Sequence, residues 1–319
     1  MSQRSTDVRD SALLGVACVA GMVVAQQLPL LGLPMTAAGA SVLVYRKRLL
    51  SALLAMAAGV VLVGALGSAW LAYAIPAAAA VLIVVLELPR RGAQAVAALF
   101  IGVLMAAAVA SDAITARLAG STLVEALKSN ASASAKALTD ALGSSASGLS
   151  EQIDLARSAI VTLWPGFYFQ TALFAAVLVI AAVAWGAARA GVVTRVPKMR
   201  DLDLSVHVLW GLLAALVLLA AGEIVGSGGA ALRSAGLNLL YCVRALFFLQ
   251  GLAVFSAVFD IPKTGRVKMV VIYLVLWVID QVLLVVTLVG LVDFWANFRR
   301  LPRDGASTTA PEQESAAGL

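Results

Sequence analysis

Three ionisable side chains stand within apolar stretches of the chain, where a charge is costly unless it is paired or functional. Arg244 and Asp280 lie in two successive apolar runs, and Glu223 lies near the end of the run before them. If the two runs form a membrane hairpin, a rise of about 1.5 Å per residue places Arg244 and Asp280 about 6 Å apart in height. An arginine side chain can close that gap and bind a carboxylate through two nitrogens.

Two roles are open for this group. One is a structural ion pair that fixes the register of the helices. The other is a polar site for an anionic or zwitterionic ligand, or for a proton step. Gln250 and Gln281 can join either network, and Glu223 is the alternative partner if Arg244 and Asp280 do not interact.

A second polar group closes the last apolar run. Asp293, Trp295 and Phe298 are typical of the level at which a membrane helix meets the headgroups. Arg299 and Arg300 follow directly, and long basic side chains can extend from that level to water. We predict that these residues anchor the helix at the outer interface.

Conventional catalytic signatures are missing from the sequence. It contains no His-Glu-x-x-His, no Gly-x-Ser-x-Gly and no phosphate-binding Gly-x-x-x-x-Gly-Lys pattern. The single histidine, His207, cannot build a conventional metal site, and Cys18 and Cys242 each lie inside an apolar run. We therefore expect no enzyme, no metal and no other cofactor.

Composition indicates a protein whose solvent is lipid. The chain has 319 residues, of which 62% are hydrophobic and 13% charged, and its mean hydropathy is +0.98. Soluble domains are nearer half apolar and a quarter charged. The net charge of +6 does not indicate nucleic acid, because the basic residues punctuate the ends of apolar runs. The sequence predicts an all-α, polytopic transmembrane bundle in a lipid bilayer.

Apolar runs predict eight or nine spans in two bundles, residues 1–118 and 159–300. One of the shorter runs need not cross, which leaves the count and the side of the C-terminus open. The first run could also pass for a signal peptide, although a second run follows at once. The runs are Ala12–Ala25, Leu33–Tyr45, Leu49–Trp70, Leu71–Leu88, Ala93–Ile114, Ile160–Ala188, Leu204–Val225, Leu237–Phe259 and Met269–Trp295. The last would be about 40 Å long, so it must tilt, kink or protrude.

The segment between the bundles, residues 119–158, is too polar to span. Leucines spaced mostly at three, four or seven, with Glu125/Lys128 and Lys136/Asp140 at helical spacing, predict a pair of weakly amphipathic helices outside the membrane. This segment is either a spacer or a docking element for another membrane protein. The tail, residues 301–319, has the composition of a disordered segment.

The distribution of basic residues predicts the orientation. With the N-terminus inside, 14 of the 23 Lys and Arg residues fall on the inner side, mostly in short turns, and 8 on the outer side, mostly in the long segment and the tail. Positive charge in short loops favours the cytoplasmic side. We predict a cytoplasmic N-terminus and an extracytoplasmic segment 119–158.

The second half resembles a known family in three stretches. They are Gly236–Leu240, Phe247–Ala253 and the closing Gly-Leu-Val-Asp-Phe-Trp-Ala-Asn-Phe-Arg of residues 290–299. They resemble the YybS-like family of uncharacterised bacterial integral membrane proteins, whose layout of five spans, a polar helical segment and a second bundle is similar. The N-terminal half of that family is distantly similar to the substrate-binding S components of energy-coupling-factor (ECF) vitamin transporters. The resemblance implies a place in the bacterial cytoplasmic membrane, with no substrate to carry over.

Two functions from different classes follow. The first is small-molecule binding or transport of the S-component kind, which an aqueous cavity lined by Arg244 and Asp280 would favour. The second is a scaffold or assembly role, which an exposed apolar face on residues 119–158 would favour. Ala17, Gly21 and Ala25 form a small-residue stripe that suits either a transmembrane partner or packing within the chain.

Overall fold

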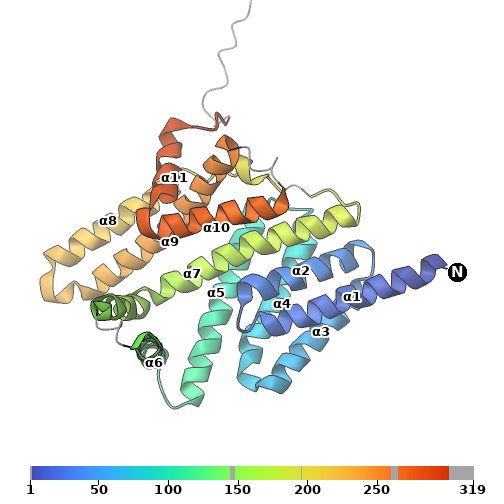
Figure 1. Ribbon diagram of the computed structural model, residues 1–319, viewed down its shortest axis with the longest axis horizontal. Helices are drawn as coiled ribbons and strands as arrows, with labels where there is room; N and C mark the ends of the chain where they lie inside the picture. Colours follow the sequence, from blue (N-terminus) through green and yellow to red (C-terminus); the bar gives the residue numbers. More distant parts are fainter. Residues whose placement is uncertain (1, 144–147, 195, 260–264, 302–319) are drawn as a thin grey trace, which may run out of the picture. The chain divides into compact units, whose positions relative to one another are not determined.

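The computed structural model describes residues 2–143, 148–194, 196–259 and 265–301, and this part of the chain is helical without a strand. The predicted all-α class is confirmed (Figure 1). The helices are α1 (Ser2–Val24), α2 (Pro29–Tyr45), α3 (Leu49–Leu66), α4 (Leu71–Glu87), α5 (Ala93–Leu118), α6 (Leu123–Leu142), α7 (Ser150–Arg189), α8 (Val208–Ile224), α9 (Ala230–Val258), α10 (Arg266–Leu283) and α11 (Val285–Ala296). Residues 260–264, in the predicted basic turn, and the predicted disordered tail after Leu301 lie outside the described residues.

Four helices are long and apolar enough to cross a membrane: α3, α5, α7 and α9. The pair α10 and α11 makes a fifth if the two count as one bent span. Helices α2, α4, α8 and the apolar part of α1 (Asp10–Val24) are apolar but no longer than 17 residues. A hydrocarbon core of about 30 Å needs about 20 helical residues. The predicted count of eight or nine spans is therefore not confirmed.

The helices group into two units. The first comprises Met1–Val196 with Leu212–Cys242, and the second comprises Pro197–Gly211 with Val243–Leu319. In the first unit, α2 packs on α1 and α7, α1 also packs on α3, and α4 packs on α5. Its core is built largely from Ala, Val and Leu side chains of these helices.

The small-residue stripe of α1 serves packing within the chain. A Cβ atom on Gly21 would lie 2.5 Å from the Thr36 hydroxyl, and one on Gly32 would lie 2.1 Å from the Ala25 nitrogen. Such a crossing brings the backbones of α1 and α2 together and leaves no room for side chains. The alternative role, a face for a transmembrane partner, is not needed to explain Gly21 or Ala25.

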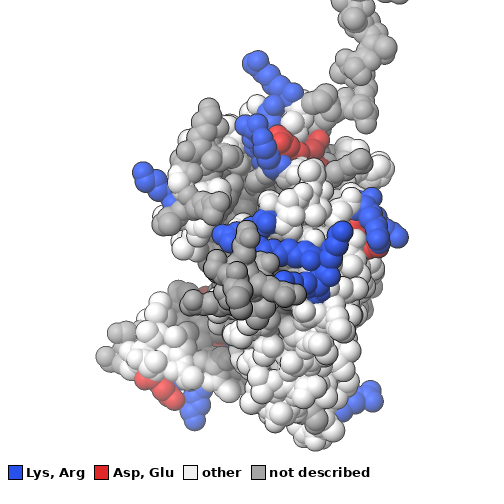
Figure 2. All heavy atoms as spheres, turned by 90° about the vertical axis from the view of Figure 1, so that its right-hand side faces the viewer, with Lys and Arg blue, Asp and Glu red and all other residues white. Residues whose placement is uncertain are grey.

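Basic residues collect at one end of the first unit. Helices α2 and α4 are followed by Arg46-Lys47-Arg48 and Arg90-Arg91, and α7 ends at Arg189. These ends lie where α1 begins, because consecutive helices of the unit run in opposite directions (Figure 1). Figure 2 looks onto this side and shows Lys and Arg side chains gathered over it.

The segment predicted to lie outside the membrane forms α6 and the first turns of the 40-residue α7. Thr122 begins α6 with a capping box, in which its hydroxyl accepts from the Glu125 N–H and the Glu125 carboxylate accepts from the Thr122 N–H. The Thr122 N–H and, with a smaller effect, the Thr122 hydroxyl donate hydrogen bonds to the Glu125 carboxylate, and these bonds lower the pKa of Glu125. Local hydrogen bonds thus hold α6, whose one buried residue in the described set is Ala131.

The run predicted as one helix, Met269–Trp295, is broken in the second unit. Helices α10 and α11 meet at 93°, and Leu284 between them has a left-handed backbone with φ of 54°. The kink is one of the three outcomes left open for so long a run. Helix α11 lies against α9 at two glycines: a Cβ on Gly251 would be 1.9 Å from the Val286 carbonyl oxygen, and a Cβ on Gly290 would be 1.9 Å from that of Phe247.

Candidate functional site

Asp280 stands at the break between α10 and α11 with its side chain 1% exposed. Its Oδ1 accepts from the Thr287 N–H at 2.8 Å, and its Oδ2 accepts from the Thr287 hydroxyl at 2.8 Å. Thr287 is the third residue of α11, so its N–H has no partner within the helix. The carboxylate therefore caps α11 and sits at the positive end of its dipole.

Arg244 reaches Asp280 from α9. Its Nη2 donates to the Asp280 carbonyl oxygen at 3.2 Å and lies 3.5 Å from the carboxylate Oδ2. The structure thus brings this predicted pair together, but through one nitrogen and at the long end of hydrogen-bond distance. The closer partner of Asp280 is Thr287, while Arg244 supplies the compensating charge. The Arg244 side chain remains 28% exposed.

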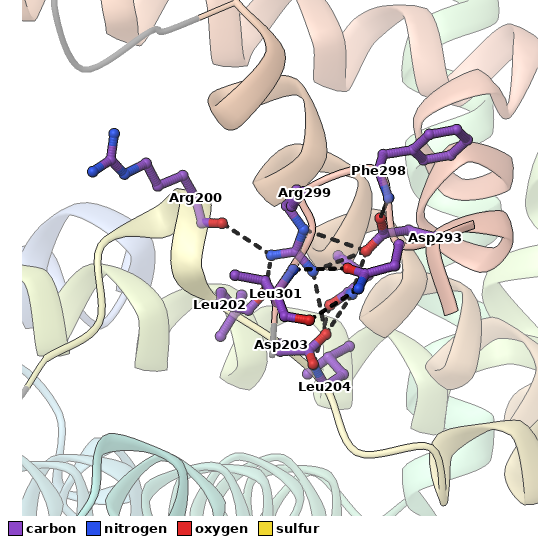
Figure 3. Close-up of polar contacts among 10 residues, drawn as sticks. Arg200, Leu202, Asp203, Leu204, Asp293, Phe298, Arg299 and Leu301 are labelled. Carbon is purple, nitrogen blue, oxygen red and sulfur yellow. Dashed lines mark hydrogen bonds and ion pairs between the residues drawn. The ribbon is translucent and has the colours of Figure 1, made fainter. Parts of the chain in front are cut away.

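A second polar cluster lies at the other end of α11 (Figure 3). The Gln250 amide nitrogen donates to Asp203 Oδ1 at 3.0 Å and to Asp293 Oδ2 at 2.9 Å. Arg299 Nη2 donates to the same two oxygens, at 3.2 Å and 2.9 Å. Two carboxylates therefore share two donors. We call Asp203, Gln250, Asp293 and Arg299 the α11 clamp.

The α11 clamp ties the end of α11 to the segment before α8. Arg299 Nη1 donates to the carbonyl oxygens of Arg200, at 3.0 Å, and of Leu202, and Gln250 Oε1 accepts from the Leu204 N–H at 3.1 Å. The side chains of Asp293 and Arg299 are 0% and 1% exposed, whereas that of Asp203 is 32% exposed. Asp203 is thus the more exposed of the two carboxylates.

The other predicted residues lie apart from these contacts. Glu223, in the last turn of α8, is bonded to Arg233, in the first turn of α9, with Nε to Oε1 at 2.7 Å and both side chains exposed. Gln281 is exposed and donates to the Trp277 carbonyl oxygen. Of the predicted interface anchors, Trp295 and Arg300 are exposed, while Asp293 and Arg299 are buried and bonded to each other. The sequence reasoning did not identify Asp203, which stands in a basic loop.

A cavity of about 510 Å³ lies in the first unit. Its one charged lining residue is the exposed Asp112 on α5, whose Oδ2 accepts a hydrogen bond from the Tyr168 hydroxyl of α7. Rings of Trp70, Tyr73 and Trp164 also line it. The full lining is Ala25, Gln26, Gln27, Pro29, Trp70, Tyr73, Leu104, Ala108, Ser111, Asp112, Thr115, Leu127, Ile160, Trp164, Phe167, Tyr168, Thr171 and Ala172.

Asp112 was also missed by the sequence reasoning. It is the one acidic residue in the run Ala93–Ile114, so the rule that singled out Arg244 would have found it. Within the part of the chain that the structure describes, Asp112 makes no ion pair, and no group of three or more His, Cys, Asp or Glu side chains is placed to hold a metal. The cavity thus contains one uncompensated carboxylate.

In a comparison with known protein families, one family model matches most of the chain. The model described as "Predicted membrane protein (DUF2232)" matches residues 15–294. Searches of curated proteins and of solved structures give no match.

We predict that Asp280→Ala lowers the melting temperature of the detergent-solubilised protein more than Arg244→Ala does. Removing Asp280 uncaps α11 and leaves the Arg244 charge unpaired, whereas removing Arg244 leaves both bonds from Thr287 in place. Loss of one partner of a buried pair costs roughly 3–5 kcal/mol in soluble proteins, and less is expected in a membrane. The double variant should be no less stable than Asp280→Ala. Additive losses would show that the two side chains do not interact.

For the α11 clamp, we predict that Arg299→Lys lowers the melting temperature, while Arg300→Lys leaves it unchanged. An ammonium group cannot reach both carboxylates and two carbonyl oxygens as the planar guanidinium does. The lost hydrogen bonds to charged groups are worth about 1.5–3 kcal/mol each. Arg300 is a matched control because it is adjacent, basic and exposed. Equal melting temperatures for the two variants would contradict the role of Arg299.

Proposed function

Because the chain belongs to the DUF2232 family of predicted membrane proteins, we propose that it binds or carries a small molecule in the cavity of its first unit. The cavity around Asp112 is the observation that carries this proposal. Small-molecule sites are typically concave, about 300–1,000 Å³ in volume, and lined by apolar and aromatic side chains with a few polar groups. The lining of α5, α7 and the turn after α1 fits that description.

The buried acids of the second unit already have partners within the chain, which favours the cavity of the first unit as the ligand site. Asp280 is occupied by Thr287 and Arg244, and Asp293 by Gln250 and Arg299. Among the described residues, no buried side-chain nitrogen or oxygen is left without a hydrogen-bond partner. These contacts stabilise a broken helix. The cavity that favours ligand binding thus lies beside Asp112, whereas the sequence left open a ligand site at Arg244 and Asp280.

A second candidate function is a scaffold that recruits a partner through α6 and the start of α7. Its support is a set of exposed apolar side chains outside the apolar spans: Val124, Leu138, Leu149 and Leu155, each 42–62% exposed. Patches of this kind are typical of interaction sites when they are contiguous. Neither function requires catalysis, and we propose none.

We also propose that the N-terminus is cytoplasmic, since the basic ends of α2, α4 and α7 lie where α1 begins. A cysteine at Asn130, exposed on α6, should react with an impermeant maleimide in intact cells, whereas a cysteine at Lys47, exposed after α2, should react only after lysis. Short basic turns favour the inner side. The opposite labelling pattern would reverse the orientation.

The binding proposal is tested by native mass spectrometry of the protein released from mild detergent. We expect a retained small molecule in the wild-type protein and in Ala106→Phe, where the added ring points away from the cavity on the exposed face of α5. Ala108→Phe fills the cavity and should lose the retained molecule.

A wild-type protein without any bound molecule, or an Ala108→Phe protein that retains it equally well, would contradict the proposal. A copurifying protein chain that is lost in Leu138→Gln or Leu155→Gln, with no small molecule in any sample, would support the scaffold instead.

A further inference from the structure

We propose that the ligand of this cavity carries an ammonium-type cation, held between the Asp112 carboxylate and the rings of Trp70, Tyr73 and Trp164. The inference rests on the proposed function and specifies its substrate class. Its first basis is charge. Asp112 is the one charged side chain among the lining residues.

Asp112 differs from the buried acids of the second unit because it is exposed and has no counter-charge among the described residues. Asp280 is paired with Arg244, and Asp293 with Arg299. Asp112 makes no ion pair within the described part of the chain, and its described partner is the neutral Tyr168 hydroxyl. That hydrogen bond uses Oδ2 and fixes the carboxylate, so Oδ1 is available to a ligand. A cationic ligand would supply to the exposed Asp112 the counter-charge that the buried Asp280 and Asp293 receive from arginines.

The aromatic lining is the second basis. Trp164 and Tyr168 meet edge to face with ring centroids 5.8 Å apart, and Trp70 and Tyr73 face the same cavity. Aromatic rings attract cations through their negative faces, tryptophan most strongly, and clusters of such rings recognise quaternary ammonium groups. The same rings offer no attraction to an anion, and the carboxylate repels one.

The polar remainder of the lining suits the rest of such a molecule. Gln26, Gln27, Ser111, Thr115 and Thr171 carry amide and hydroxyl groups that can donate and accept. None of them is charged, so they add specificity without offsetting Asp112. The lining thus fits a small organic cation with a hydroxyl or carbonyl group rather than a bare metal ion, which would require several oxygen ligands with charge.

Choline and its neutral isostere 3,3-dimethylbutan-1-ol are suitable probes, because they have the same shape and differ in charge. The full-length protein is reconstituted in phosphatidylglycerol nanodiscs, which contain no choline headgroup, and binding is followed by calorimetry. We expect choline to bind at least about tenfold more tightly than the isostere, since only the cation interacts with carboxylate and rings.

The variant Asp112→Asn should lose this preference while its amide oxygen still accepts from Tyr168. The matched control Asp140→Asn, an exposed acid on α6, should keep it. Trp164→Leu should weaken choline binding and leave the isostere nearly unchanged. Melting temperatures of the variants show that each is folded.

Equal affinities of choline and the isostere, or a charge preference that survives in Asp112→Asn, would overturn the inference. A molecule that is retained in native mass spectra and carries no cation would also overturn it, while the proposed binding function would stand. If the wild-type protein retains no molecule and responds to neither probe, both the inference and the proposed binding function are overturned.

Discussion

A charge inside hydrocarbon must find its counter-charge or hydrogen-bond partners within the protein, and this constraint governs the structure. Asp280 satisfies it through the N-terminus of α11 and Arg244. Asp293 satisfies it through Gln250 and Arg299. Asp280 precedes the 12-residue α11 and Asp293 lies in its last turn, so the stability of this short helix depends on the partners of both acids.

The break at Leu284 follows from that dependence. A continuous helix through Leu284 would leave the Thr287 N–H bonded to the Leu283 carbonyl and the Asp280 carboxylate without its two short hydrogen bonds. The turn instead exposes the N-terminal N–H groups of α11 to the carboxylate, which the helix dipole favours. Close contact at Gly251 and Gly290 then lets α11 lie on α9 without side chains between the backbones. Asp280 and Thr287 thus stabilise the break in the apolar run, and Gly251 and Gly290 allow α11 to pack on α9.

Much of this could be predicted from the sequence, because the apolar runs are long and basic residues mark their ends. The helical class, most helix positions, the helix α6 in the polar segment and the proximity of Arg244 to Asp280 follow from hydropathy and from the rise per residue. The position of the 93° break could not be predicted, because Leu284 is an ordinary apolar residue and its conformation is set by contacts of Asp280 and Thr287. Asp203 joins Asp293 across 90 positions of sequence, and the cavity depends on the packing of α5 against α7. Neither the contact of Asp203 nor the cavity is marked by a pattern of neighbouring residues in the sequence.

The buried acids Asp280 and Asp293 stabilise the fold through their partners, whereas the exposed Asp112 is the residue that we propose binds a ligand. The most direct measurement is an electron cryo-microscopy map of the purified protein in lipid nanodiscs. The account predicts density for a bound molecule beside the Asp112 carboxylate and within about 6 Å of the Trp164 ring, the range of a cation–π contact. A cavity closed by side chains, with Asp112 paired to a basic residue of the chain, would contradict it.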